Sequence, residues 1–221
     1  MAADRRSARR AARRLIEIYS RLAERREPLF ASVLKGQAPS QWEHYPQADA
    51  IDAAHGFQWF YHCHSPEDRP GASEHGHVHL FARRDRLAPF ARSKAEAEFS
   101  RLTHRNRRRA KTRHLLAIGF DPRGLPTQLF MVNSWVTGDL MASATTTAAL
   151  LAELRLDTGF ADVDGVIEAV CRLCADEIGA LLAQRDRALA AHAGPHPLDD
   201  ASLELLSAVD IDLDRKLAAY Q

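Results

Sequence analysis

The chain has 221 residues, of which 46% are hydrophobic and 27% are charged, and its formal net charge is +1. This composition is typical of a soluble globular protein, and the length fits one domain over residues 1–221. No apolar run approaches the ~20 residues that span a bilayer, and a net charge near zero argues against a dedicated nucleic-acid-binding protein. The three cysteines form no disulfide framework, so we expect a cytoplasmic protein.

An amphipathic helix is predicted at the N-terminus, within residues 1–35. Apolar residues recur at three- and four-residue spacing from about Ser7 to Leu34, with arginines between them, and Pro28 interrupts the pattern. The arginines occur in pairs, which favours a solvated face, while an anionic partner stays open as the alternative. The segment from Gly36 to Asp52 contains two prolines and is predicted to be a loop.

Two histidine-rich strands are predicted next, over residues 57–65 and 75–83. Side chains two apart in a strand point to one face, and the proline-containing connection predicts a long hairpin. The hairpin brings one face of each strand together, and that face carries the imidazoles: Phe60, His62, His64, His75, His77, His79 and Phe81. The opposite face holds aromatic and aliphatic side chains, which we expect to be buried under helices.

The predicted antiparallel sheet spans residues 57–139 and is interrupted by an insertion over residues 85–113. The insertion combines a helix with a basic run that ends at Arg113, and this run lacks the interleaved aromatic residues that stack on bases. An exposed helix end or loop is therefore favoured over a phosphate site. Residues 114–121 and 127–139 are predicted as the third and fourth strands, and strict alternation places these residues on one side: His114, Leu116, Ile118 and Phe120.

The C-terminal segment, residues 145–221, is predicted to be helical. Its helices cover Thr145 to Leu156, Asp162 to His192 and Asp199 to Ala219. Cys171 and Cys174 spell C-x-x-C on an apolar stripe, which favours core packing. The predicted fold class is α+β, with a four-stranded antiparallel sheet and the N- and C-terminal helices packed on one of its faces.

The histidines on the other face are candidate ligands of a divalent transition metal. Imidazole suits zinc, iron, copper and nickel; zinc or iron is favoured, with copper, nickel and manganese as further candidates. The candidate ligands are His62, His64, His75, His77, His79 and His114. Glu74 is a further ligand or an orienting partner, and with His77 it forms the candidate catalytic pair. Because no cysteine quartet is present, an open coordination position is favoured. The sequence thus predicts a metalloenzyme, a hydrolase or oxidoreductase, with its site on residues 60–64 and 75–81.

The triplet His75-Gly-His77-Val-His79-Leu-Phe also resembles the His-φ-His-φ-His-φ-φ pattern of the histidine triad superfamily of nucleotide hydrolases and transferases. The resemblance implies that the middle histidine, His77, is the nucleophile on a phosphate. Arginines of the basic run would then neutralise the phosphate charge. This metal-free nucleotidyl or phosphoryl transferase is the alternative to the metalloenzyme.

Over most of its length the chain resembles an uncharacterised bacterial family of about this size. The residues that carry the likeness are the H-x-H pair at 62–64, E-H-G-H-x-H-L-F at 74–81 and N-x-W-V-T-G-D at 133–139. In the last of these, a strand that ends in a Gly-Asp turn is favoured over a ligand site. The family implies no chemistry, so a non-enzymatic metal- or anion-binding adaptor also stays open. We expect a small-molecule substrate and no membrane or nucleic-acid partner; the oligomeric state is open.

Overall fold

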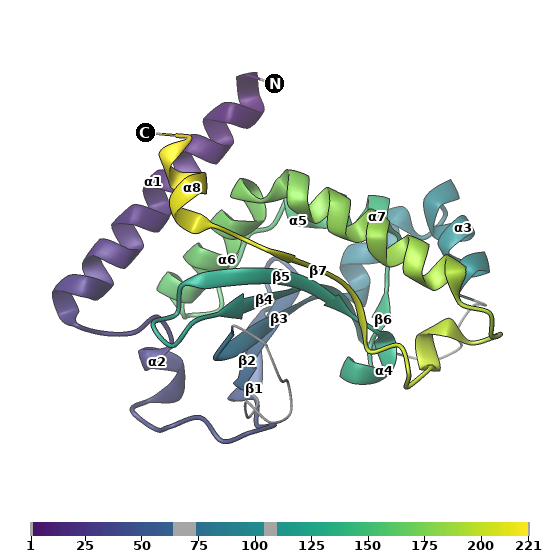
Figure 1. Cartoon of the computed structure of the whole chain (residues 1–221), viewed down its shortest axis with the longest axis horizontal. Helices are drawn as coiled ribbons and strands as arrows, with labels where there is room; N and C mark the ends of the chain where they lie inside the picture. Colours follow the sequence, from purple (N-terminus) through teal and green to yellow (C-terminus); the bar gives the residue numbers. More distant parts are fainter. Residues whose placement is uncertain (1, 64–73, 104–109, 221) are drawn as a thin grey trace.

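The computed structural model describes residues 2–63, 74–103 and 110–220, and within them a seven-stranded sheet forms the centre of the molecule (Figure 1). Six strands follow the order β1-β2-β3-β4-β5-β7 with antiparallel neighbours, and β6 pairs in parallel with β4. The strands are β1 (Tyr45–Asp52), β2 (Phe57–Cys63), β3 (Gly76–Arg83), β4 (Thr112–Phe120), β5 (Pro126–Val132), β6 (Leu140–Met141) and β7 (Leu205–Asp210). The predicted mixture of helices with an antiparallel sheet is confirmed.

Helices cover one face of this sheet, where α1 packs on α6 and α7 packs on β5 and β7 (Figure 1). The helices are α1 (Ala2–Arg25), α2 (Ala31–Leu34), α3 (Lys94–Leu102), α4 (Ser134–Thr137), α5 (Ala144–Ala152), α6 (Ala161–Leu173), α7 (Ala175–Ala191) and α8 (Leu213–Ala218), with short 3₁₀ helices η1 (Arg84–Phe90) and η2 (Pro197–Asp199). No helix in the described ranges is both long and apolar enough to cross a membrane.

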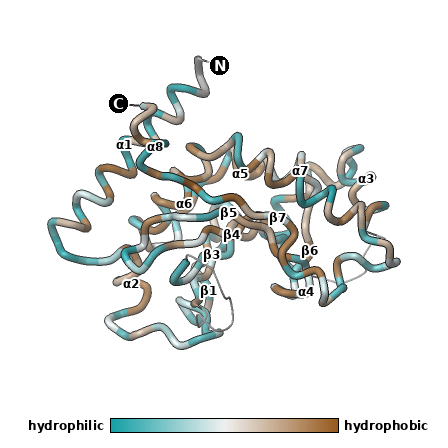
Figure 2. The backbone as a smooth tube through the Cα atoms, viewed as in Figure 1, coloured by the Kyte–Doolittle hydropathy of each residue, from teal (hydrophilic) through white to brown (hydrophobic). Residues whose placement is uncertain are grey.

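The main hydrophobic core lies between the sheet and these helices. Trp59, Val78 and Leu80 are fully buried on the sheet side, and Leu15 and Val166 are fully buried on the helix side. Burying a side chain of this size contributes roughly 1.5–3 kcal/mol. Hydrophobic and hydrophilic residues alternate along α1, so one stripe of the helix faces this core (Figure 2). The strand alternation therefore predicted the buried face of β2 and β3 correctly.

The expectation of four strands was wrong because it missed three short or irregular ones. β1 lies in the segment predicted as a loop, and its pairing with β2 shifts register between Tyr45 and Ala50. Such a strand is tolerated at a sheet edge, where Pro46 need not donate a ladder hydrogen bond. β7 lies inside the segment predicted as the last helix and forms the opposite edge beside β5. β6 has only two residues.

Two predicted elements also end earlier than expected. The fourth strand stops at Val132, where Asn133 caps the short helix α4 by accepting a hydrogen bond from the Ser134 N–H group. The long helix predicted from Asp162 to His192 is two helices, α6 and α7, that meet at Cys174. In the insertion, η1 and α3 are helical, while residues 104–109 of the basic run lie outside the described residues.

A β-bulge in β4 changes the side on which His114 lies. Leu80 pairs with Leu116 and Phe81 pairs with His114, so Leu115 is an extra residue between the two pairs. The prediction that Leu116, Ile118 and Phe120 share a face with His114 was therefore wrong, because all three belong to the helix-covered core. The bulge instead turns His114 toward the histidines of β3.

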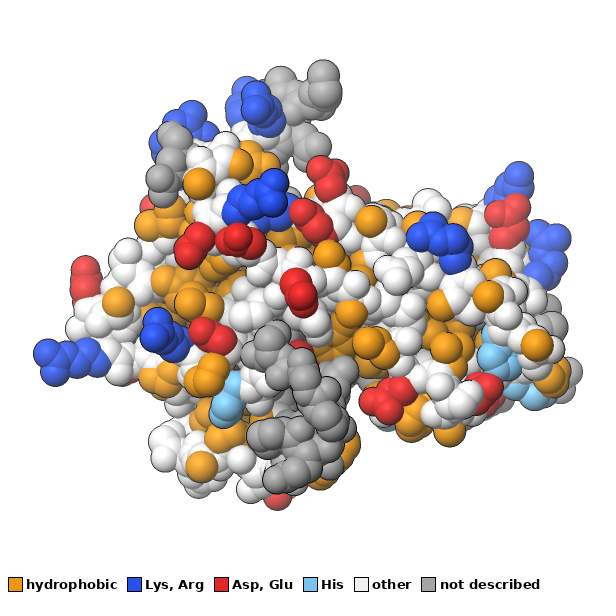
Figure 3. All heavy atoms as spheres, viewed as in Figure 1, with side chains coloured by type: hydrophobic (Ala, Val, Ile, Leu, Met, Phe, Trp, Pro, Cys, Tyr) orange, Lys and Arg blue, Asp and Glu red, His pale blue; other side chains and the backbone are white. Residues whose placement is uncertain are grey.

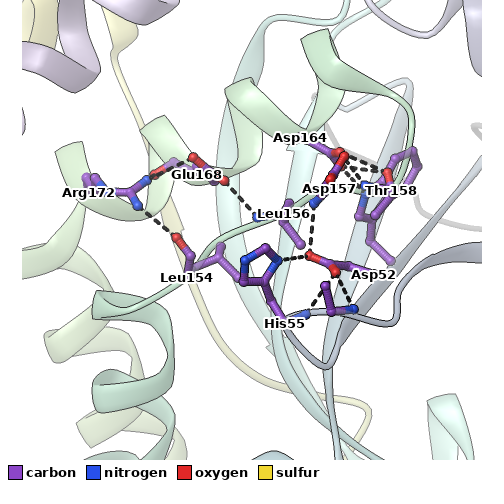
Figure 4. Close-up of polar contacts among 11 residues, drawn as sticks. Asp52, His55, Leu154, Leu156, Asp157, Thr158, Asp164, Glu168 and Arg172 are labelled. Atoms are coloured by element: carbon purple, nitrogen blue, oxygen red, sulfur yellow. Dashed lines mark hydrogen bonds and ion pairs between the residues drawn. The ribbon is translucent and has the colours of Figure 1, made fainter.

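Buried carboxylates hold the loop between α5 and α6 against the sheet (Figure 4). Each of the three carboxylates accepts a hydrogen bond from a backbone N–H group of this loop: Asp52 from Asp157, Asp164 from Thr158, and Glu168 from Leu156. The indole N–H group of Trp59 also donates to Asp164 at 2.8 Å. These contacts satisfy backbone groups that burial would otherwise leave without partners.

Candidate metal centre

The hairpin of β2 and β3 brings three histidines together on the sheet face opposite the helix-covered core. His62 pairs with His77 across the two strands, and His79 is two residues further along β3. One ligand nitrogen from each ring lies within 4.8 Å of the others, and His77 and His79 are each only 2% exposed. His62, His77 and His79 together form the histidine cluster.

The rings of the histidine cluster lie close together, edge to face. The Nε2 atoms of His62 and His77 are 2.5 Å apart, and the ring of His79 lies 4.7 Å from that of His77 and 5.1 Å from that of His62. Zinc binds imidazole nitrogen at about 2.0–2.1 Å, which in a tetrahedral site separates two ligand nitrogens by about 3.3 Å. Seating an ion between the rings would therefore require the His62 and His77 nitrogens to separate by about 0.8 Å, and nitrogens that lie 4.8 Å apart to approach by about 1.5 Å.

Glu74 orients the ring of His77 from behind. Its Oε1 atom lies 3.1 Å from His77 Nδ1, and both side chains are almost fully buried. A carboxylate accepts hydrogen bonds, so Nδ1 carries the proton and Nε2 presents its lone pair to the cluster. Gly119 lies opposite His77 in β4, and a Cβ atom there would collide with Glu74 Oε2. Glycine at this position thus makes room for the carboxylate.

His114 orients the ring of His79 in the same way. Its Nε2 atom lies 3.0 Å from His79 Nδ1, so His114 stands behind the histidine cluster rather than inside it. When His79 presents Nε2 to an ion, its Nδ1–H group donates to His114 Nε2. The proton of His114 then sits on Nδ1, a buried atom that has no hydrogen-bond partner in the part of the chain that the structure describes.

Burial keeps these imidazoles neutral. It holds the pKa of His79 well below its usual value, and the neighbouring His77 and His114 lower it further. Burial also lowers the pKa of His114 to about 3, with a smaller effect from the positive charge of Arg185. A metal binds the neutral imidazole, so the lowered pKa keeps His79 in the ligand form at neutral pH.

The chain matches the family model described as a domain of unknown function (DUF6969) over residues 9–211. The chain belongs to this family. The prediction of an uncharacterised family is thereby confirmed, and no curated protein or solved structure matches the DUF6969 chain.

Of the remaining predicted ligands of the DUF6969 chain, His75 stands apart from the histidine cluster. His75 precedes β3, is exposed, and lies with its Nδ1 atom 3.1 Å from the Tyr61 hydroxyl, which belongs to the opposite side of the sheet. Gly76 permits this because a Cβ atom there would collide with that hydroxyl. His64 lies outside the described residues.

Aromatic rings surround the histidine cluster and separate it from water. Phe60 and Phe81 were predicted on this face; their rings are 5.5 Å apart and each contacts the ring of His79. The sequence interpretation missed Phe130, whose ring lies 5.1 Å from that of His77, and His44, which stacks on Phe60 at 3.6 Å. His44 precedes a strand that was expected to be a loop, so no pattern placed it near the site.

The Asn133 motif and the C-x-x-C motif of the DUF6969 chain make structural contacts. The Asn133 amide donates to the carbonyl oxygens of Pro197 and Leu203, which ties the end of β5 to the segment before β7. Cys171 and Cys174 are buried, and burial raises the pKa of their thiols to about 12 and about 11. Both therefore stay protonated, as expected for core cysteines.

Proposed function

We propose that the chain is a metalloenzyme in which the histidine cluster binds one zinc ion. The observation that carries the proposal is the convergence of the three ring nitrogens within 4.8 Å, with Glu74 and His114 each holding one ring from behind. Core histidines need partners, but they have no reason to direct their ring nitrogens at a common point. Metal-binding histidines are held by carboxylate or other acceptors in this way.

Zinc is proposed ahead of iron because of the ligand set. The described ligands are imidazoles, and Glu74 contacts a ligand ring instead of lying among the three ligand nitrogens. Non-haem iron enzymes commonly use two histidines and one carboxylate, whereas three histidines are an established catalytic zinc set. Iron stays the second candidate, followed by copper, nickel and manganese.

Hydrolysis of a small molecule is the proposed reaction class. Three neutral ligands leave the full charge of a zinc ion uncompensated, and such an ion lowers the pKa of bound water to about 7. The aromatic rings of Phe60, Phe81 and Phe130 exclude bulk water from the cluster, and His62, at 9% exposed, is its most accessible member. The residues of this chain would thus hold and orient the ion and keep the site dry.

Metal content of protein made without a polyhistidine tag tests the proposal. We expect about one zinc or iron ion per chain by mass spectrometry, and a loss of most of it in His62→Ala and His77→Ala. His196→Ala is the matched control, because His196 is exposed and lies outside the site. Metal-free protein that also fails to bind added zinc or iron would refute the proposal. A bound ion with no open coordination position would favour the adaptor.

The histidine-triad alternative retains one supporting observation. Because Glu74 holds Nδ1 of His77, Nε2 is the nitrogen that carries the lone pair, as a phosphate-transferring histidine requires. Incubation with labelled nucleotides would then trap a covalent adduct that His77→Ala abolishes. Absence of any adduct, together with a bound metal, would exclude this alternative.

A further inference from the structure

A second site lies away from the histidines, in a cleft between α1, the C-terminal end of α5 and α6. The cleft has a volume of about 420 Å³. Its charged lining consists of four arginines and two glutamates, which come from three separate segments of the chain: Arg10, Arg14, Glu153, Arg155, Glu168 and Arg172. The cleft therefore has an excess of two positive charges, although the whole chain has a net charge of only +1.

Two of these arginines, Arg14 and Arg172, pair with Glu168 in the lining of the cleft. Glu168 is 5% exposed, and its Oε2 atom lies 2.5 Å from Arg14 Nη1 and 3.4 Å from Arg172 Nη1. Arg172 also donates to the carbonyl oxygen of Leu154 at 2.7 Å, as Figure 4 shows. These contacts hold both guanidinium groups beside Glu168, although the Arg14 side chain is 46% exposed.

The other two arginines have side chains that no described protein group engages. Within the described residues, Arg10 and Arg155 make no ion pair and no side-chain hydrogen bond, and both are exposed at the cleft. Glu153 also lines the cleft; its side chain is 73% exposed, and its Oε2 atom lies 3.7 Å from Arg86 Nη2, whose positive charge partly offsets it. The guanidinium groups that remain open to a ligand are thus those of Arg10 and Arg155, which come from α1 and from the loop after α5.

We propose that this cleft binds the phosphate group of a small phosphorylated ligand. A phosphate monoester carries about −1.5 to −2 charge at pH 7, which matches the excess of the cleft. The planar guanidinium group forms paired hydrogen bonds to phosphate oxygens. A volume of about 420 Å³ lies within the range of small-molecule pockets, so the cleft suits a sugar-phosphate-sized ligand.

A polyanion on α1 is the competing explanation. Arg6, Arg9, Arg10 and Arg13 share one stripe of the helix and line a groove of about 410 Å³ beside the cleft. Lys and Arg side chains are prominent around the N-terminal end of α1 (Figure 3). A polymer on this stripe would not need Arg155, which lies between α5 and α6. Arg155 therefore distinguishes the cleft from the helix stripe.

Calorimetric titration of the full chain with inorganic phosphate and with ribose 5-phosphate tests the proposal. We expect saturable binding with a Kd near or below about 1 mM at low salt. Arg155→Gln and Arg10→Gln should each weaken it by about tenfold or more, because each removes a charge-assisted contact. Arg92→Gln, which removes an exposed arginine outside the cleft, should bind like the wild type. The melting temperatures of all three variants check that they are folded.

Three results would overturn the proposal. One is the absence of saturable binding of either phosphate compound by the wild type. Another is unchanged binding by Arg155→Gln. The third is tight binding of a short single-stranded RNA or of anionic vesicles, if Arg155→Gln retains this binding and a combined substitution of Arg6, Arg9 and Arg13 abolishes it. That result would identify the helix stripe as the anion-binding surface. None of these readouts involves the histidines.

Discussion

The substitution Glu74→Gln separates a metal site from a group of core histidines. It keeps the size of the side chain and an oxygen that can accept from His77 Nδ1, but it removes the negative charge. The contact is 3.1 Å long, and the two side chains are 4% and 2% exposed, so solvent screens it little. In a metal site the loss of this charge makes the His77 ring a weaker electron-pair donor to the metal ion.

The expected size of the effect follows from the role of such partners. Removing a group that orients a ligand typically costs 10–100-fold in metal affinity, which corresponds to about 1.4–2.7 kcal/mol. If the histidines are only packed together, the same change leaves a neutral hydrogen bond in place of a charged one. In that case the free energy of unfolding of the metal-free protein would change, and neither the wild type nor the variant would bind metal.

Competition with a chromophoric zinc chelator measures this affinity on protein made without a tag. We expect Glu74→Gln to bind zinc 10–100-fold more weakly than the wild type. Glu17→Gln is the control, since Glu17 is exposed on α1 and lies outside the site. Equal zinc affinities for Glu74→Gln and the wild type, with zinc bound, would refute the orienting role and the tautomer assigned to His77.

Three further predictions test the surroundings of the site. Gly119→Ala changes no ligand but should lower zinc affinity, because the new Cβ atom displaces the Glu74 carboxylate behind the cluster. The same chelator assay measures the affinity, and an unchanged value would contradict this prediction. The folded-state pKa values of His79 and His114 lie below the unfolded value of about 6.5. The metal-free protein should therefore lose stability as the pH falls through 6.5 toward about 3, by up to about 1.4 kcal/mol per pH unit for each ring. Urea unfolding at several pH values measures this slope, which His114→Leu should reduce. Trp59→Phe removes a donor from the buried Asp164 and should lower the free energy of unfolding by about 1–3 kcal/mol, whereas a change below about 0.5 kcal/mol would mean that the contact is dispensable.

The strand period of two was the informative part of the sequence. It placed His62, His77 and His79 on one face and Trp59 on the other, because both strands are regular, central and buried on both sides. The regular ladder between β2 and β3 has no register shift, so counting residues was enough to bring the rings together. Where the ladder is irregular, counting failed: the extra residue Leu115 reverses the faces of the rest of β4.

The missed parts of the fold and the site depend on contacts between distant segments. β1 and β7 are edge strands, which need to satisfy only one neighbour and so carry a weak pattern. His75 continues the alternation of β3 in the sequence, but the strand begins one residue later and its ring reaches Tyr61. The orienting position of Glu74 depends on Gly119 of β4, which no local pattern of the hairpin reveals.

The hydrogen bonds behind the rings leave the Nε2 atoms of His77 and His79 available to a metal ion. Glu74 fixes the proton of His77 on Nδ1, so the Nε2 lone pair is directed at His62, 2.5 Å away. Nitrogen lone pairs that converge in a buried space repel unless a proton or a cation lies between them. A neutral His62 can supply that proton from Nε2, and burial, which holds the pKa of His79 well below its usual value, disfavours a further proton on that ring. Under the proposed function a divalent ion takes the place of that proton, and binding it would offset the cost of burying the imidazoles.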